Sequence, residues 1–459
     1  LETMFLLLRR VPNGLAPMGV IFRKFLQGVG ADILATPRYE EQWNNKLDNT
    51  LVPRIVDLHT KYRKLVKNSF SEHNTFHRAL KEAFEFFVNL PLPPDEEQPG
   101  EGGKKKHRTR RLEVTISEVL SDYIDRRLRK SASDMVPRSP SIPEMETFLT
   151  PRKETALERH LVMAVDIFGY INDKDVFGQF YRKHLAKRLI LNRSASIDAE
   201  KVVIGKLKQV GGNPCVSKFT GMIKDLMLAK TLQNDFDAFL GEEKEEIPPY
   251  ETNVKVLTSG FWPTYSEEPI KNLPQTMQLA IDQFAKFYAT RTAHRVLTWV
   301  HSLGSMLITA TLGNNRKIDV VVNAIQGAIL LQFNTPLDGS PQVEHTPEAI
   351  ALILGISDDT VNKHLLPMIQ GKYPLMKQCK DTLKCSINLE FESKCRRIRI
   401  PMLPGMKSSQ SKEDRAANLL KISEERRYAV EAAIVRIMKT HNRLSHAELS
   451  QKVIEKLSP

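Results

Sequence analysis

The sequence has few cysteines and lacks the short motifs that mark catalytic and metal sites. Its 459 residues include four cysteines, which are Cys215, Cys379, Cys385 and Cys395. None belongs to a CxxC pair or has a histidine at metal-ligand spacing, so we expect free thiols and no metal site. The phosphate-binding GxxxxGKS/T, the HExxH and the GxSxG patterns do not occur either. We therefore expect no cofactor and no enzymatic activity in this chain.

Long apolar runs are also missing, since no stretch approaches the roughly 20 residues that a membrane-spanning helix needs. The start of the chain lacks the charged and apolar regions of a secretory signal, and it lacks an initiator methionine. We expect either a fragment or an incomplete gene model of a protein that resides in the cytoplasm and nucleus, with no membrane partner. The 41% hydrophobic and 26% charged residues are typical of a globular protein, and the length allows about three domains.

Basic residues are in excess, with a formal net charge of +13. This balance favours an acidic partner, either nucleic acid or an acidic protein surface, and charge alone does not choose between them. Part of the excess lies in a Pro- and Gly-rich linker at 91–111, which carries basic residues from 104 to 111. That run is either a solvated insertion or an anion-binding or nuclear-import patch. A second insertion, rich in Ser and Pro, occupies 131–153.

Apolar residues at three- and four-residue steps predict a mainly α-helical first half. We expect a helical repeat over 1–90 and a four-helix bundle over 112–249, which includes the 131–153 insertion. One bundle helix places Phe177, Tyr181, Leu185 and Leu189 on its core face. Its other faces carry Arg182, Lys183, His184, Lys187 and Arg188. These basic residues are either simply solvated or form a landing site for an acidic segment.

From residue 250 the apolar period shifts towards two, which predicts strands at 254–258, 296–300, 306–312 and 318–322 around a helix at 276–289. We read 250–335 as a small α+β unit. Residues 336–402 have the winged-helix pattern of two short helices and a hairpin, with strands expected at 384–391 and 396–400. A polar linker at 403–413 and a helical segment at 414–459 complete the chain.

The nonapeptide EAAIVRIMK at 431–439 resembles the modification segment of cullins. Other segments resemble the same family in the same order. They are RRVPNGLAPM at 9–18, VDLHTKYRKLVKNSF at 56–70, INDKDVFGQFYRKHLAKRLI at 171–190, SASIDAEKVVIGKLKQVGG at 194–212, VKVLTSGFWP at 254–263, FAKFYATRTAHRVLTW at 284–299 and AIQGAILLQFN at 324–334. The resemblance covers nearly the whole chain apart from the two insertions.

The resemblance implies a non-catalytic scaffold of a ubiquitin ligase complex. It implies that Lys439 receives a ubiquitin-like modifier through an isopeptide bond (neddylation), which activates the ligase. The residues fit, because Ile434, Ile437 and Met438 form one apolar stripe and leave the Lys439 amine near solvent. Cullins bind their substrate adaptor through N-terminal repeats that this chain lacks. Residues 414–459 would form an incomplete second winged helix.

The resemblance also implies a small zinc-binding RING protein as partner, which adds a strand to the α+β unit. The matching positions are Val254, Val256, Leu257, Leu297, Trp299 and Val320. The RING protein recruits a ubiquitin-conjugating enzyme, whose acidic tail meets a basic groove in the family. Lys183, Lys187 and Arg188 match that groove.

A winged-helix nucleic-acid-binding protein is the alternative, supported by the net charge and the basic runs. Asp358 and Asp359 oppose it. They lie in the first turn of the second helix, where they would face phosphates if that helix entered a groove.

Overall fold

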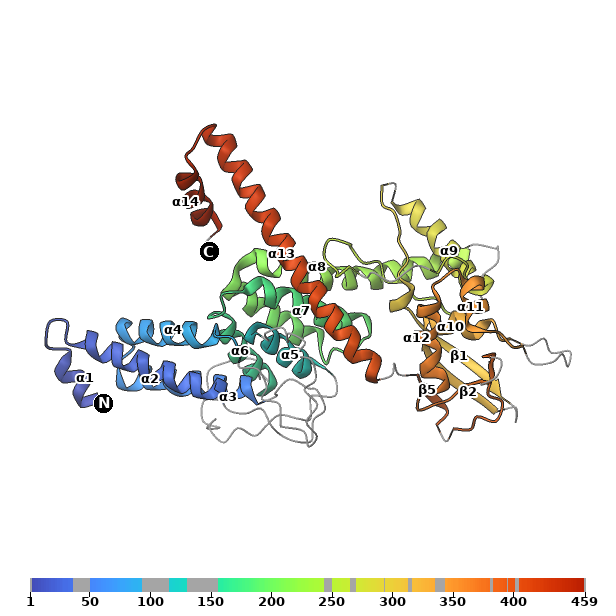
Figure 1. Ribbon diagram of the computed structural model, residues 1–459, viewed down its shortest axis with the longest axis horizontal. Coiled ribbons are helices and arrows are strands. Elements are labelled where there is room, and N and C mark those ends of the chain that lie inside the picture. Colours follow the sequence, from blue (N-terminus) through green and yellow to red (C-terminus); the bar gives the residue numbers. More distant parts are fainter. Residues whose placement is uncertain are drawn as a thin grey trace, which may run out of the picture. The chain divides into compact units, whose positions relative to one another are not determined.

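The computed structural model describes residues 2–35, 50–92, 115–129, 156–242, 250–264, 270–292, 294–312, 316–334, 343–379, 383–393, 395–400 and 404–457 (Figure 1). The basic run at 104–111 and the insertion at 131–153 lie outside these residues. The chain divides into two compact units, the first of Leu1–Ile223, Thr258–Pro263 and Asn418–Pro459, and the second of Lys224–Leu257 and Thr264–Ala417. Within the described ranges, no helix has the length and apolar character needed to cross a membrane.

The first unit begins with the expected helices, α1 (Glu2–Leu8), α2 (Leu15–Ala35), α3 (Leu51–Ser69) and α4 (Asn74–Val88). Their core is rich in aromatic rings. Phe70 and Phe76 stack at 3.9 Å, and the ring of Phe5 packs against both. The prediction of a helical repeat over 1–90 holds for the described part, in which α2 lies along α3 and α4 (Figure 1).

The bundle of the first unit contains α5 (Ile116–Leu128), α6 (Ala156–Phe168), α7 (Lys174–Ile190) and the part of α8 (Ile197–Glu242) that ends at Ile223. Phe177, Tyr181 and Leu185 are fully buried on the expected core face of α7. Helix α8 is interrupted at Gly212, whose φ of 76° lies in the left-handed region that glycine adopts without strain. Pro214 follows two residues later and reinforces the interruption.

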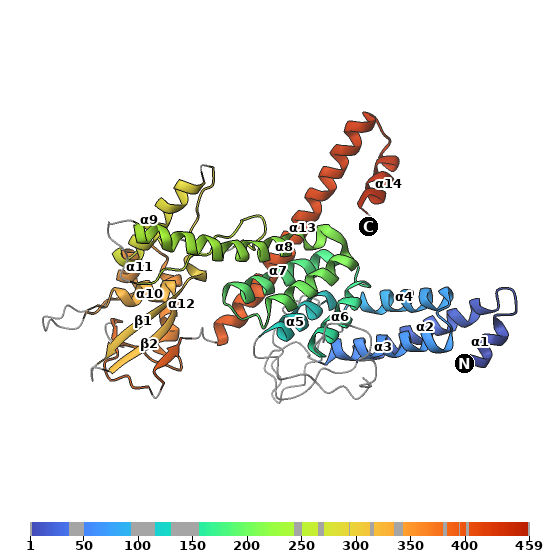
Figure 2. The same ribbon diagram turned by 180° about the vertical axis from the view of Figure 1, so that it is seen from behind.

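The second unit holds α9 (Gln275–Arg291), the short 3₁₀ helix η2 (His301–Leu303), β1 (Ser305–Leu312), β2 (Arg316–Asn323) and α10 (Ala324–Leu331). Strands β1 and β2 are antiparallel, with Ser305 opposite Asn323 and Leu312 opposite Arg316. A reciprocal capping box between Asn323 and Gln326 starts α10 directly after β2. Figure 2 shows β1 and β2 side by side from behind.

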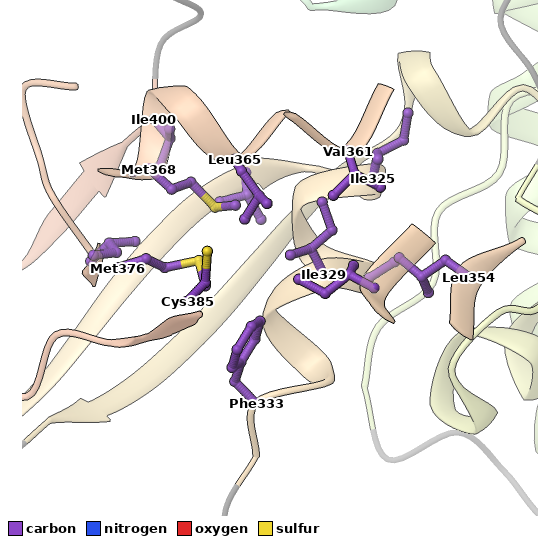
Figure 3. Packing of buried hydrophobic residues seen from close by; sticks show 14 of the residues in the cluster. Ile325, Ile329, Phe333, Leu354, Val361, Leu365, Met368, Met376, Cys385 and Ile400 are labelled. Atoms are coloured by element: carbon purple, nitrogen blue, oxygen red, sulfur yellow. The ribbon is translucent and has the colours of Figure 1, made fainter. Parts of the chain in front are cut away.

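The winged-helix prediction is correct for its helices, α11 (Pro347–Leu354) and α12 (Asp358–Ile369), which are separated by Gly355 at a φ of 65°. Strands are present within both predicted runs, 384–391 and 396–400, but they do not pair with each other as the expected hairpin. The hairpin joins β3 (Met376–Gln378) to β4 (Cys385–Ile387), while β5 (Arg397–Arg399) runs parallel to β2 and completes a sheet of order β1-β2-β5. Side chains from α10, α12 and the hairpin share one core, in which Ile329, Leu365 and Met376 lie close together (Figure 3).

Two further expectations need correction. The segments 254–258 and 296–300 are extended, but they join no sheet in the described part of the chain. The expected linker at 403–413 is helical from residue 404, because α13 (Pro404–His441) is one long helix that precedes α14 (His446–Leu457). Residues 414–457 are helical, as expected, and the helix begins earlier than predicted. The incomplete second winged helix stays a prediction.

Candidate modification site and partner-binding surfaces

Lys439 lies in the last turn of α13 and its side chain is exposed. The opposite side of that helix is packed, because Ala433 and Ile437 are buried against Val453 of α14. Ile434 and Met438 are half-buried, so the predicted apolar stripe exists and leaves the lysine on the solvent side. A cation in the last turn also interacts favourably with the carbonyl end of the helix.

The turn between α13 and α14 is well defined. Ser445 and Glu448 form a reciprocal pair, in which the Glu448 amide donates to Ser445 Oγ at 3.3 Å and the Ser445 amide donates to Glu448 Oε2 at 3.2 Å. These bonds from Ser445 lower the pKa of the Glu448 carboxyl. The two helices thus form a hairpin (Figure 1), and Lys439 lies in the last turn of its first helix.

Arg426 of α13 forms ion pairs with Asp173 and Asp175 at the start of α7, and we call this contact the ionic latch. The latch ties α13 to α7. Arg426 Nη2 lies 2.8 Å from Asp173 Oδ1 and 2.8 Å from Asp175 Oδ1. Burial raises the pKa of Asp175, but the bonds and charge of Arg426 outweigh it and the net shift is downward. Ile422 packs on Val176 and Phe180 beneath the latch. Asp173 is the N-cap residue of α7, but its side chain makes no hydrogen bond to that helix and accepts one from Arg426.

The extended segments 250–257 and 294–300 lie on one aromatic cluster of the second unit. Val254, Val256, Leu297 and Trp299 pack against the buried rings of Phe236, Phe284, Phe287 and Tyr288. Exposure alternates along 296–300, where Leu297 and Trp299 face the cluster and Val296 is 93% exposed. This alternation is that of a strand with one buried face, although neither segment pairs with a strand in the described residues.

The start of the first segment is tied to α8 by Gln233. Its side-chain Nε2 donates to the Thr252 carbonyl at 2.9 Å, and its Oε1 accepts from the Val254 amide at 3.0 Å. Leu257 is half-buried and follows the two valines in the same segment. Five of the six predicted partner positions therefore lie on these two segments.

Val320 is placed differently. It lies in β2, the central strand between β1 and β5, and its side chain is fully buried. Both edges of β2 are already paired, so no added strand can reach it. The adjacent edge strand β1 is the accessible one, and its Leu307 is 52% exposed.

The structure removes one of the three residues of the predicted basic groove. Arg188 is 1% exposed and its guanidinium binds both oxygens of Glu200, at 2.8 and 2.9 Å, and Asp125 at 2.6 Å. Lys187 is exposed and Lys183 half-exposed, as a groove requires. The prediction for Arg188 was wrong, because the sequence pattern does not reveal that the carboxylates of α5 and α8 converge on it.

Asp122, Asp125 and His184 lie close enough together to suggest a metal site. The geometry does not fit one. Asp125 already receives Arg188 and Arg129, with His184 Nδ1 at 3.4 Å, and Asp122 pairs with Arg126. Burial raises the pKa of Asp125, but His184 and the two arginines lower it by more, so the net shift is downward. The carboxylate therefore stays ionised and paired. This arrangement is an ion-pair network that joins helices.

Three residues that the sequence patterns did not single out for these roles now stand out, namely Arg182, Gln233 and Arg426. Each bonds a residue outside its own helix, and single-sequence periodicity does not report such contacts. The sequence shows only that a long polar side chain lies next to an apolar stripe. It does not indicate which residue that side chain will contact.

Comparison with known proteins gives three matches in chain order. Residues 1–233 match the cullin alpha solenoid domain, residues 256–393 the cullin alpha+beta domain, and residues 425–459 the cullin protein neddylation domain. Lys439 lies in the third. The whole chain is 33% identical to Cullin-1 of Oryza sativa, 31% to Cullin-2 of Arabidopsis thaliana and 27% to Cullin-4A of Homo sapiens. It spans 57%, 57% and 53% of their lengths.

Proposed function

The chain belongs to the cullin family, and we propose that it is a non-catalytic scaffold part of a ubiquitin ligase complex. The observation that carries this proposal is the exposed Lys439 on a helix packed on its other side, within the segment that matches the neddylation domain. A scaffold contributes by holding two partners at high effective concentration, and it needs no reactive groups of its own.

We propose that Lys439 accepts the ubiquitin-like modifier. Its neutral amine would attack the thioester carbonyl at the modifier's C-terminus, the conjugating enzyme's thiol would leave, and an isopeptide bond would form. The exposed position in the last turn of α13 leaves room for both proteins. The test is an in vitro reaction with the purified modifier cascade. We expect one modified product with the wild-type chain and none with Lys439→Arg.

Lys456→Arg is the matched control, because Lys456 is an exposed lysine of the same hairpin, on α14. It should be modified as the wild type is. A single product that persists in Lys439→Arg, or is lost only in Lys456→Arg, would contradict the assignment of the acceptor.

We propose that a small zinc-binding RING protein binds the second unit by strand addition. Support comes from two extended segments with strand-like alternation and from the open edge of β1. An incoming strand would form hydrogen bonds with backbone groups of the extended segments. The half-buried side chains of these segments, Val254, Val256, Leu297 and Trp299, would hold them on the aromatic cluster. Zinc would then reside in the partner. Co-purification of a zinc-containing RING protein with the chain tests this, and the absence of any such complex at micromolar concentrations would refute it.

The ubiquitin-conjugating enzyme would be recruited by that RING protein. Of the basic positions, Lys183 and Lys187 remain as contacts for an acidic tail, and Arg188 is withdrawn because it is buried. We assign no substrate-adaptor contact to residues 1–459. Residence in the cytoplasm and nucleus stays a prediction, to be checked by microscopy of a tagged chain.

The nucleic-acid-binding alternative is not favoured. Helix α12 does carry Asp358 and Asp359 in its first turn, where they repel phosphates. Binding to duplex DNA with a steep salt dependence would revive it.

A further inference from the structure

We infer that Arg182 of α7 is a positioning residue that holds the loop Thr258–Pro263, and with it the end of the extended segment 250–257, ready for an added strand. This inference rests on the proposed RING-protein binding. It concerns a residue of the first unit that contacts no proposed partner.

Arg182 bonds three successive carbonyls of the loop. Its Nε donates to the Phe261 carbonyl at 2.6 Å, and its Nη2 donates to the Gly260 carbonyl at 3.2 Å and also to the Trp262 carbonyl. One planar guanidinium therefore binds the backbone over a full turn. Such bonds from a charged donor are stronger and more directional than those between neutral groups.

The loop is also closed by its own backbone. The amides of Phe261 and Trp262 both donate to the Thr258 carbonyl, at 2.9 and 3.3 Å. The carbonyls of Gly260, Phe261 and Trp262 thus converge on the side that Arg182 occupies. Without a cation there, these dipoles would repel one another, and the turn would be less stable.

The side chains of the loop are also held by packing. The Trp262 side chain is 2% exposed, and the Phe261 ring lies against Gly221 of α8. A Cβ at Gly221 would lie 2.5 Å from the Phe261 ring, so any larger residue displaces the ring. Arg182 binds the loop backbone, and Gly221 leaves the space that the Phe261 ring occupies. Together they favour one conformation of this loop.

The consequence concerns the segment that precedes the loop. Gln233 fixes its start at Thr252 and Val254, and the loop fixes its end at Thr258. A segment held at both ends loses less conformational entropy when a partner strand pairs with it, and this raises affinity without any direct contact. Arg182 thus tunes partner binding from a distance.

The experiment measures the affinity of the full chain for a zinc-loaded small RING protein by biolayer interferometry, together with amide hydrogen exchange over 252–262. We expect Arg182→Ala to weaken binding about tenfold, mainly through faster dissociation, and to speed exchange in this stretch. Gly221→Ala should do the same by displacing the Phe261 ring. Arg182→Lys should fall between, because an ammonium cannot reproduce the guanidinium fork. Lys208→Ala, an exposed site on α8, is the control.

The outcomes separate the two claims. If the wild-type chain binds no RING protein, the proposed function fails and this inference with it. If the wild type binds and both Arg182→Lys and Gly221→Ala bind equally well despite faster exchange, the positioning role alone is overturned. A lower melting temperature with unchanged affinity would also overturn it, since that is what a purely structural residue gives. Should Arg182→Ala not fold, the two milder variants decide.

Discussion

Replacing Arg188 by methionine tests whether this residue is a buried cross-link or part of a surface groove. The guanidinium is 1% exposed, and both Asp125 and Glu200 are fully buried. After replacement, Asp125 would keep Arg129 and His184, whereas Glu200 would lose both guanidinium bonds and keep the Ser194 hydroxyl at 2.8 Å. One buried carboxylate is then stranded. Breaking a buried pair in this way costs about 3–5 kcal/mol, and the surviving partners of Asp125 favour the lower end.

Urea and thermal unfolding of the purified chain, followed by circular dichroism, measure this cost. A loss of about 3 kcal/mol lowers the melting temperature of a unit of this size by roughly 6–12 °C. Hydrogen exchange should quicken in α5 and α7, where the network lies. The double variant Arg188→Met/Glu200→Gln should recover a large part of the loss, because the stranded charge is removed. A loss below about 1 kcal/mol, within the range of ordinary surface substitutions, would refute the buried cross-link and restore Arg188 to the groove.

Three further predictions follow from named contacts. Arg426→Ala should open the ionic latch and speed exchange in α13, at a cost of about 1 kcal/mol, because the pair is half-exposed and screened. Burial, aided by the charge of Arg63, lowers the pKa of His59 to about 4. The unfolded chain therefore binds an extra proton between that value and about 6.5, and stability should fall by about 3 kcal/mol as pH drops through this window. Trp299→Ala should weaken RING-protein binding about tenfold by loosening its segment from the aromatic cluster.

Each of these three predictions has a control experiment. About 1 M salt, where the Debye length is about 3 Å, should reproduce the effect of Arg426→Ala in the wild type and add little in the variant. His59→Gln should flatten the pH dependence of unfolding, and an unchanged slope would assign it to another group. Val296→Ser changes a 93% exposed neighbour of Trp299. If that variant weakens binding as much as Trp299→Ala, anchoring to the cluster is not the cause.

The periodic apolar patterns predicted the positions and buried faces of the helices well. The core face of α7, the stripe beneath Lys439 and the two helices before the hairpin were all visible, because local spacing alone decides which side of a helix is buried. Lys439 could be singled out because a run of nine residues resembles a known segment. Local pattern and tertiary packing agree in these places.

Strand pairing and polar contacts were less predictable. The segment at 296–300 has the alternation of a strand, but a strand also needs a neighbour, and none lies in the described chain. Strand β5 pairs in parallel with β2. The sequence of β5 does not indicate which strand it will pair with. Arg188 and Lys187 look alike in the sequence, and only the folding of α5 and α8 around one of them makes the first a core residue.

The open edge of β1 has a consequence for handling the protein. An edge strand with an exposed Leu307, near segments that carry the alternation of strands, offers a template to any other chain with unpaired backbone groups. Two copies of the chain would compete with the partner for the same edge. Solubility should therefore depend on the molar ratio at which the two proteins are produced, and co-expression should give material that stays monodisperse at concentrations where the chain alone precipitates.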